Sequence, residues 1–226
     1  MALAAEDSPQ PRRRLSRQLV LERAVEMADR QGIEAVSMRR LAQELGVEAM
    51  SLYHWFGKKT DIYQGMLEAV WAEVELPPAG EDWRPALRGT AISAYRALLR
   101  HPWATGLGTI GDVSDARLQW MDAVLGRLRL AGFSPELIDL GYHVIDSHIE
   151  GFVLWVIPFT VLSRERPNFA QEFLAEHPVD DLPDLADHIA WHLRPPTGNE
   201  VSPFEFGLDL ILDGLERRLE SSRSNP

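Results

Sequence analysis

Residues 36–59 read VSMRRLAQELGVEAMSLYHWFGKK, and this pattern predicts two short helices joined by a tight turn. Ser37 is a suitable N-cap for the first helix, because its hydroxyl can accept a hydrogen bond from a free N–H group of the first turn. Leu41 and Leu45 recur at helical spacing and indicate the buried side of that helix. Gly46 is expected to end it, because glycine readily adopts the left-handed backbone that a helix C-terminus often needs.

The second helix of the pair is expected to begin near Glu48, whose carboxylate suits the positive N-terminal end of a helix. Leu52 and Phe56 are four residues apart and are therefore expected to face the interior. The side chains around them are then left facing outward as a mixed polar and aromatic surface. This arrangement is typical of a helix-turn-helix, in which one helix supports a second that is presented to a DNA groove.

The run from Gly32 to Lys59 closely resembles the DNA-binding domain of tetracycline-repressor-type (TetR-like) transcriptional regulators. The LAQELGV run, the LYxxF run and a lysine that opens the next helix carry this resemblance, which spans about residues 14–75. Three later segments are similar, more loosely, to the effector-binding part of the same family: AYRALLR (94–100), AGFSPELID (131–139) and FEFGLDLILDGLERRL (204–219). The resemblance implies an N-terminal helix-turn-helix domain of three helices, followed by a larger helical domain for effector binding and dimerisation.

The order of elements along the chain agrees with that organisation. Residues 1–14 are expected to be a disordered arm, either a solvated terminus or a basic segment that touches DNA. Residues 15–75 are the expected DNA-binding domain, and the LPPAGE run that begins at Leu76 is expected to separate it from an effector-binding and dimerisation domain over residues 76–226. No alternating strand pattern appears, so the expected fold class is all-α. Helices are expected over residues 16–31, 60–75, 83–100, 116–130, 135–156, 170–176, 184–193 and 204–219.

The charge of the chain is unevenly distributed. The net charge is −11 over 226 residues, but residues 1–60 carry ten Lys/Arg and eight Asp/Glu, so the acidic excess lies in the remainder. A relatively basic head on an acidic body is compatible with one end that faces DNA. The absence of cysteine excludes disulfides and cysteine-ligated metals. No signal peptide or 18-residue apolar run appears, so a cytoplasmic protein without membrane contact is expected.

The resemblance implies which side chains contact operator DNA. Arg39 corresponds to an arginine that the family uses against DNA, where a guanidinium can bind guanine O6 and N7; a merely solvated arginine is the alternative. Tyr53 and Lys59 correspond to phosphate contacts. Ala49 and Met50 stand where the tetracycline repressor has glutamine and proline, so a different operator sequence is expected. The full DNA-facing set is Met38, Arg39, Ala49, Met50, Ser51, Tyr53, His54, Trp55 and Lys59, with a core position for Trp55 left open.

An all-α body rich in aromatic residues also indicates an effector cavity. The candidate lining residues are Trp103, Tyr142, His143, Asp146, Ser147, His148, Glu150, Trp155 and Phe159. Asp146 and Glu150 lie four residues apart on an otherwise apolar helix, and buried charges need partners or a ligand. Gly106 stands where the tetracycline repressor has a histidine that holds its drug–magnesium chelate. The expected effector is therefore an apolar or aromatic small molecule, with no metal or cofactor.

A homodimer is expected, because operator specificity normally requires two heads about one helical turn apart, roughly 34–36 Å. The helices over residues 135–157 and 204–219 offer apolar faces for an isologous four-helix bundle, unless both faces fill the core of the monomer. The mechanism implied is repression by the unliganded dimer on a palindromic operator. A bound effector would shift the fourth helix and change the head spacing, with a coupling free energy of roughly 1–3 kcal/mol.

Two other classes of function are compatible with parts of the sequence. A ligand-binding scaffold of the same fold would not read DNA. An enzyme with a metal on His188 and His192 is the other alternative, because their i, i+4 spacing suits zinc. That helix lacks the glutamate of HExxH, however, and the chain has no serine elbow, phosphate-binding loop or dinucleotide fingerprint. The prediction from sequence is therefore a transcriptional regulator and not an enzyme.

Overall fold

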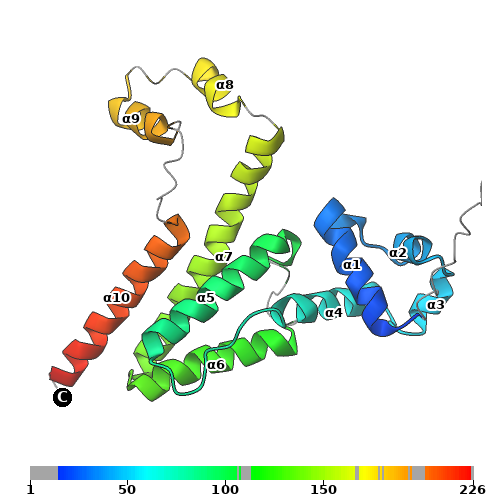
Figure 1. The fold of residues 1–226 in the computed structure, drawn as a ribbon, viewed down its shortest axis with the longest axis horizontal. Coiled ribbons are helices and arrows are strands. Elements are labelled where there is room, and N and C mark those ends of the chain that lie inside the picture. Colours follow the sequence, from blue (N-terminus) through cyan, green and yellow to red (C-terminus); the bar gives the residue numbers. More distant parts are fainter. Residues whose placement is uncertain are drawn as a thin grey trace, which may run out of the picture. The chain divides into compact units, whose positions relative to one another are not determined.

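The computed structural model describes residues 15–105, 107, 113–165, 168–177, 179, 181–192, 194 and 202–224. These residues form helices and contain no strand, so the all-α prediction is confirmed (Figure 1). The α-helices are α1 (Arg17–Gln31), α2 (Met38–Leu45), α3 (Ala49–Tyr53), α4 (Lys59–Trp71), α5 (Trp83–Arg100), α6 (Asp115–Ala131), α7 (Pro135–Glu165), α8 (Phe169–Glu176), α9 (Pro183–His192) and α10 (Pro203–Ser224). Two 3-10 turns, η1 (Ile33–Ala35) and η2 (Pro102–Ala104), complete the order.

The chain divides into two compact units, a head over Met1–Met66 and a body over Leu67–Pro226. The division falls inside α4, whereas the sequence places a boundary at Leu76. The end of α4 belongs to the body because its aromatic side chain packs there: the Trp71 ring centroid lies 5.5 Å from that of Trp120 in α6.

The head is held by local signals that the sequence predicts. Ser16 and Ser37 cap α1 and α2, each accepting a hydrogen bond from the backbone N–H three residues on. Gly46 ends α2 in the left-handed conformation, with φ of +66°. Leu52 and Phe56 are both buried. These positions fix α3 against α2, so the predicted helix-turn-helix is present in the structure.

The start of α4 lies one residue before the expected start at residue 60. The helix begins at Lys59, because the Asp61 carboxylate reaches back and accepts a hydrogen bond from the Lys58 N–H at 3.0 Å. Ile62 and Val70 are among the buried residues of α4.

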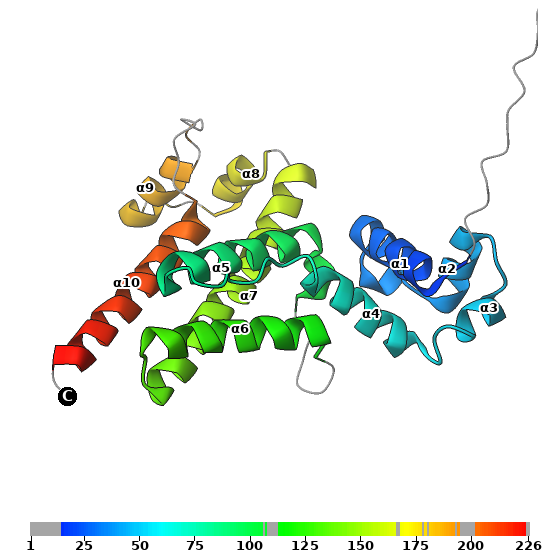
Figure 2. The ribbon, with the colours of Figure 1, turned by 60° about the horizontal axis from the view of Figure 1, so that its bottom comes forward.

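The body is a bundle in which α5, α6 and α10 each pack against the long helix α7 (Figures 1 and 2). The helix expected over residues 135–156 is longer in the structure, where α7 continues through Pro158 to Glu165. The core is aromatic: the indole N–H of Trp120 donates to Thr90 Oγ1 at 3.1 Å, and the rings of Tyr95 and Phe204 stack 3.8 Å apart.

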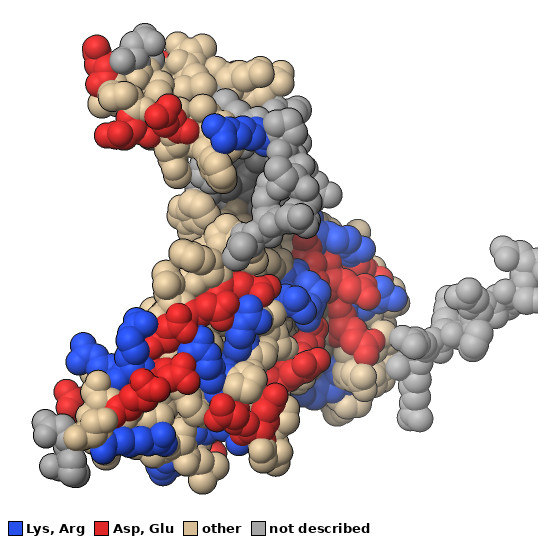
Figure 3. Space-filling view, turned by 60° about the vertical axis from the view of Figure 1, so that its left-hand side comes forward, with Lys and Arg blue, Asp and Glu red and all other residues tan. Residues whose placement is uncertain are grey.

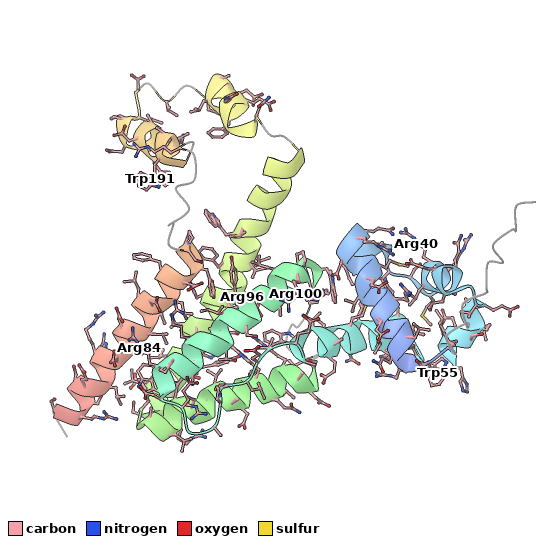
Figure 4. All side chains as sticks on the ribbon, in the orientation of Figure 1. Arg40, Trp55, Arg84, Arg96, Arg100 and Trp191 are labelled. Carbon is pink, nitrogen blue, oxygen red and sulfur yellow. The ribbon has the colours of Figure 1, made fainter. Side chains whose placement is uncertain are left out.

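Ion pairs join α5 to α10 along the outer side of the bundle. Arg84 bonds the carboxylates of Asp213 and Glu216, and Arg88 bonds those of Glu205 and Asp209 at 2.7 and 2.8 Å. Figure 3 shows basic and acidic side chains next to one another over this part of the body, and Figure 4 shows Arg84 between the two helices. The pairs fix the position of α10 along α5. Among the described helices none is long and apolar enough to cross a membrane.

Candidate DNA-binding surface and effector site

The outward surface of the head is centred on α3. Leu52 is the buried residue of α3, and the other residues of this helix and of the following turn lie at or near the surface. Met50 is the most exposed of them at 74%, and Tyr53 and Trp55 are also exposed. The structure therefore places Trp55 at the surface and not in the core (Figure 4). Its indole meets the His54 ring edge-on, with 5.8 Å between the centroids. The predicted residues Ala49 and Ser51 are half-buried beside this surface.

Two basic residues border the same surface. Arg39, in the first turn of α2, is exposed, and its side chain has no hydrogen bond or ion pair within the described part of the chain. The neighbouring Arg40 instead bonds the side chain of Gln31. Lys59 opens α4, and its ammonium lies 4.8 Å from the centroid of the Tyr63 ring. An exposed guanidinium and an ammonium on the helices before and after α3 can bind phosphates and base edges.

Met38 is a correction to the predicted DNA-facing set. Its side chain is only 8% exposed and forms part of the hydrophobic core of the head. The reason is its place in α2: Met38 lies three and four residues before the buried Leu41 and Ala42, and so falls on the inward side of the helix. Its contribution is therefore to pack α2, and Arg39, one position further on, faces outward.

The body contains a second polar cluster, centred on Arg117 in the first turns of α6. The Arg117 side chain is 11% exposed. Its Nη2 donates to Asp146 Oδ1 at 2.5 Å, and lies 3.4 Å from Glu150 Oε1, both on α7. The charged groups of Asp146 and Glu150 therefore have a protein partner that the sequence analysis did not identify. Burial raises the pKa of Glu150, and nearby Asp146 raises it further, against the opposing effect of Arg117.

Aromatic rings enclose the same guanidinium. Its central carbon lies 4.0 Å from the Trp71 ring centroid and 4.8 Å from that of Trp120, both distances typical of cation–π contacts. The Tyr142 hydroxyl donates to Asp146 Oδ2 at 3.4 Å. Burial, followed by the charge of Asp146, raises the pKa of Tyr142 to about 12, so the phenol remains protonated. These groups form one cluster because α4, α6 and α7 each contribute side chains to it.

The comparisons with known proteins identify the family of the chain. Residues 20–66 match the family described as bacterial regulatory proteins, tetR family, and residues 76–219 match the tetracyclin repressor-like C-terminal domain. The chain belongs to the TetR family of transcriptional regulators.

Individual relatives within the TetR family extend over nearly the whole chain. The class D tetracycline repressor protein of Escherichia coli is 39% identical over 215 residues, which cover 91% of each protein. The HTH-type transcriptional repressor DrrR1 of Streptomyces coeruleorubidus is 32% identical over 220 residues, covering 92% of this chain and 79% of DrrR1. The crystal structure of the TetR family protein ActR of Streptomyces coelicolor, in complex with (S)-DNPA, is 25% identical with a TM-score of 0.66, covering 90% and 98% of the two chains.

The TetR-family body brings together only part of the predicted effector set. Tyr142, Asp146 and Glu150 lie in the cluster around Arg117. His143 and Ser147 are exposed, because each follows an inward residue and is therefore turned by about 100° around α7. His143 faces Asp139 at 3.5 Å instead.

The other predicted lining residues lie elsewhere in the body. His148 Nε2 lies 2.9 Å from the Phe204 carbonyl oxygen, in a separate aromatic cluster. Trp155 is exposed, with its ring 5.7 Å from that of Phe152, and Trp103 is buried near His101. The Phe159 side chain, Gly106, residues 1–14 and the His192 side chain lie outside what the structure describes. Among the described residues no group of three or more potential metal ligands occurs.

Arg117 is the member of this cluster that the sequence did not predict. Its sequence signal is weak: a single arginine next to the buried Ala116 and one turn before the buried Trp120. Its second terminal nitrogen, Nη1, is buried and has no hydrogen-bond acceptor among the described residues, and Thr105 Oγ1 is the other such buried side-chain atom there. Arg117 and Thr105 lie on either side of residues 106–112 in the sequence.

Proposed function

We propose that the chain is a ligand-responsive transcriptional repressor, which binds a palindromic operator as a homodimer and is released by a small-molecule effector. The observation that carries the DNA-binding part is the head surface. There the exposed Arg39, which has no side-chain bond to any described residue, and the exposed Tyr53 and Trp55 lie on a helix-turn-helix. Phosphate contacts from Tyr53 and Lys59 would fix the register on the duplex, and Arg39 would read a base edge.

Exposed apolar side chains on α7 and α10 support dimerisation. A groove of about 820 Å³ runs between these helices, lined by Leu140, Val144 and Leu210 among others. All three side chains are exposed in the single chain. Contiguous apolar patches of this kind mark interaction sites, and a second copy would cover the groove through a two-fold contact.

Contacts between α4 and the body support coupling of an effector to the head. Arg117 lies over Trp71, the last residue of α4. One turn earlier on α4, the Glu68 carboxylate accepts a hydrogen bond from the Ala116 N–H at 2.9 Å. A ligand that moves Arg117 or the start of α6 would therefore act on α4. The free energy of coupling required is roughly 1–3 kcal/mol.

The names of the relatives support the same proposal. The E. coli relative is a tetracycline repressor and DrrR1 is a transcriptional repressor, and ActR has been crystallised with the small molecule (S)-DNPA. Gly106 in place of a metal-binding histidine favours an effector that is not a metal chelate. We infer that the protein carries out no catalysis and that it acts in the cytoplasm, where its operator DNA lies.

The decisive experiment is selection of bound duplexes from a random DNA library, followed by gel-shift titration of the enriched sequence. We expect a palindrome with half-sites one helical turn apart, and an affinity that falls linearly on a logarithmic salt scale. Binding that shows neither sequence enrichment nor salt dependence would leave only the scaffold alternative.

A further inference from the structure

The Arg117 cluster contains a buried guanidinium with one nitrogen, Nη1, that has no hydrogen-bond acceptor among the described residues. Nη2 is held by Asp146 and Glu150, whereas Nη1 is buried and no described protein group accepts a hydrogen bond from it. A buried donor without an acceptor costs roughly 1–3 kcal/mol, and more when it is charged. Nη1 is therefore a buried donor whose hydrogen bond is not made within the described part of this chain.

The surroundings of Nη1 indicate the chemistry of an acceptor that would fit it. Trp71, Trp120 and Tyr142 place aromatic rings around the guanidinium. Because the Trp71 and Trp120 ring centroids lie 4.0 and 4.8 Å from the guanidinium carbon, a ligand oxygen that reaches Nη1 would lie next to apolar aromatic surface. Such surface favours a planar aromatic molecule, through burial of its rings and offset or edge-on ring contacts.

The charge of the cluster decides between a neutral and an anionic acceptor. One guanidinium already faces two carboxylates, those of Asp146 and Glu150. Burial of an additional anion would add a third negative charge, which is costly in a poorly solvated site. The raised pKa of Glu150 is in keeping with this, since the site already disfavours its second negative charge. A neutral carbonyl oxygen satisfies Nη1 without this cost.

We propose that Arg117 is the polar anchor of the effector, and that its Nη1 donates a hydrogen bond to a neutral carbonyl oxygen on a planar aromatic ligand. The inference rests on the proposed function, because it names the effector class of that regulator. Asp146 and Glu150 hold Arg117 in place for this role through ion pairs, and the indole of Trp71 does so through a cation–π contact. A ligand that moves Arg117 would therefore change its contact with Trp71 and act directly on α4.

The test compares matched pairs of rigid probes by isothermal titration calorimetry on the full-length protein. 9-Fluorenone and xanthone carry the carbonyl, fluorene and xanthene lack it, and 9-fluorenone-2-carboxylate adds a negative charge. We expect at least one of the two ketones to bind the wild type tenfold or more tightly than its counterpart without the carbonyl. The carboxylate should bind more weakly than 9-fluorenone.

Variants of Arg117 test whether this residue causes the preference for a ketone over its counterpart without the carbonyl. Arg117→Met should reduce the ketone preference to less than threefold. Arg117→Lys keeps a positive charge for both carboxylates and should also lose the preference while folding normally by circular dichroism. The matched control is Arg84→Met, which removes an arginine that also bonds two carboxylates but lies between α5 and α10; it should retain the full preference.

Each other outcome overturns the proposal. Nη1 is not the anchor for a neutral carbonyl if neither ketone binds, or if each ketone binds no more tightly than its counterpart without the carbonyl. The same conclusion follows if the carboxylate binds more tightly than 9-fluorenone, or if Arg117→Lys keeps the full preference. Operator binding by the wild-type protein is measured separately by gel shift. A failure of the anchor therefore leaves operator binding intact, whereas failure of the regulator itself removes operator binding whatever the probes do.

Discussion

The carboxylate of Glu68 on α4 accepts a hydrogen bond at 2.9 Å from the backbone N–H of Ala116, in the first turn of α6. A negative charge is favourable at a helix N-terminus, where the first N–H groups lack partners within the helix. This contact joins the helix that begins in the head to the helix that carries Arg117. It is separate from the cation–π contact between Arg117 and Trp71, so two contacts, one helical turn apart on α4, join α4 to α6.

Replacement of Glu68 should loosen this link. Glu68→Ala is expected to destabilise the protein by about 1 kcal/mol, because the first turn of α6 loses its acceptor. Glu68→Gln should lose less, since the amide oxygen can still accept the Ala116 N–H. Thermal unfolding measures both effects. Glu220→Ala, at an exposed position on α10, is the control and should leave the midpoint unchanged; an equal drop in all three variants would contradict this role.

Arg39 is expected to act only through DNA. Because its guanidinium is exposed and without bonds in the described part of the chain, Arg39→Ala should lower operator affinity by about 1–3 kcal/mol and leave the thermal midpoint in place. The control is Arg30→Ala, which removes an exposed arginine of the head that bonds Glu44. Gel-shift titration on the selected operator compares the two. If Arg39→Ala binds as well as the wild type, the guanidinium does not contact the operator.

The turn between α2 and α3 depends on the backbone of Gly46. Its φ of +66° is unfavourable for a residue with a Cβ atom, although nothing lies within 4 Å of where that atom would be. Gly46→Ala should therefore cost about 1–2 kcal/mol from backbone strain alone, measured by denaturant unfolding. Gly89→Ala is the matched control, because that glycine lies inside α5 with equally open space, and it should stabilise by about 0.5–1 kcal/mol. Equal signs for the two substitutions would rule out this explanation.

The groove between α7 and α10 should be the dimer contact. Leu210, 54% exposed in the single chain, lines this groove. Leu210→Glu should convert the dimer to monomer in sedimentation equilibrium, since a buried unpaired carboxylate opposes association. It should also abolish cooperative operator binding. Leu130→Glu changes a leucine that is 82% exposed at the end of α6, and should remain dimeric. A dimeric Leu210→Glu protein would place the interface on another surface.

The α5–α10 ion pairs should make the stability of the protein decrease at low pH. The hydrogen bond from Arg88 lowers the pKa of Asp209 below its ordinary value of 3.8. A lowered pKa in the folded state contributes stability that is present above 3.8 and is lost as pH falls through the folded value. The thermal midpoint of the wild type should therefore drop below about pH 4, and that of Asp209→Asn should drop less. Asp122→Asn, at an exposed residue of α6, should follow the wild type. Parallel curves for wild type and Asp209→Asn would contradict the coupling.

The sequence by itself determined the helices of the head and their ends. Ser37 and Gly46 act through bonds and backbone angles within a few residues, and the buried side of each helix follows from a periodicity of 3.6 residues. The same local rules extended to α5, α6 and α10 in the body. At Met38 the same periodicity places the side chain inward, so the assignment of this residue to the DNA-facing set was wrong.

Only the tertiary structure decided the composition of the polar cluster in the body. Asp146 and Glu150 could be recognised as charges in need of a partner, but the partner, Arg117, lies 29 residues from Asp146 in the sequence. Which arginine meets them depends on the rotation and axial position of α6 against α7, and these are set by the packing of Trp120 and its neighbours. Periodicity predicts which side of a helix is buried. Which side chains make contact between the buried sides of neighbouring helices is decided by how those helices pack together.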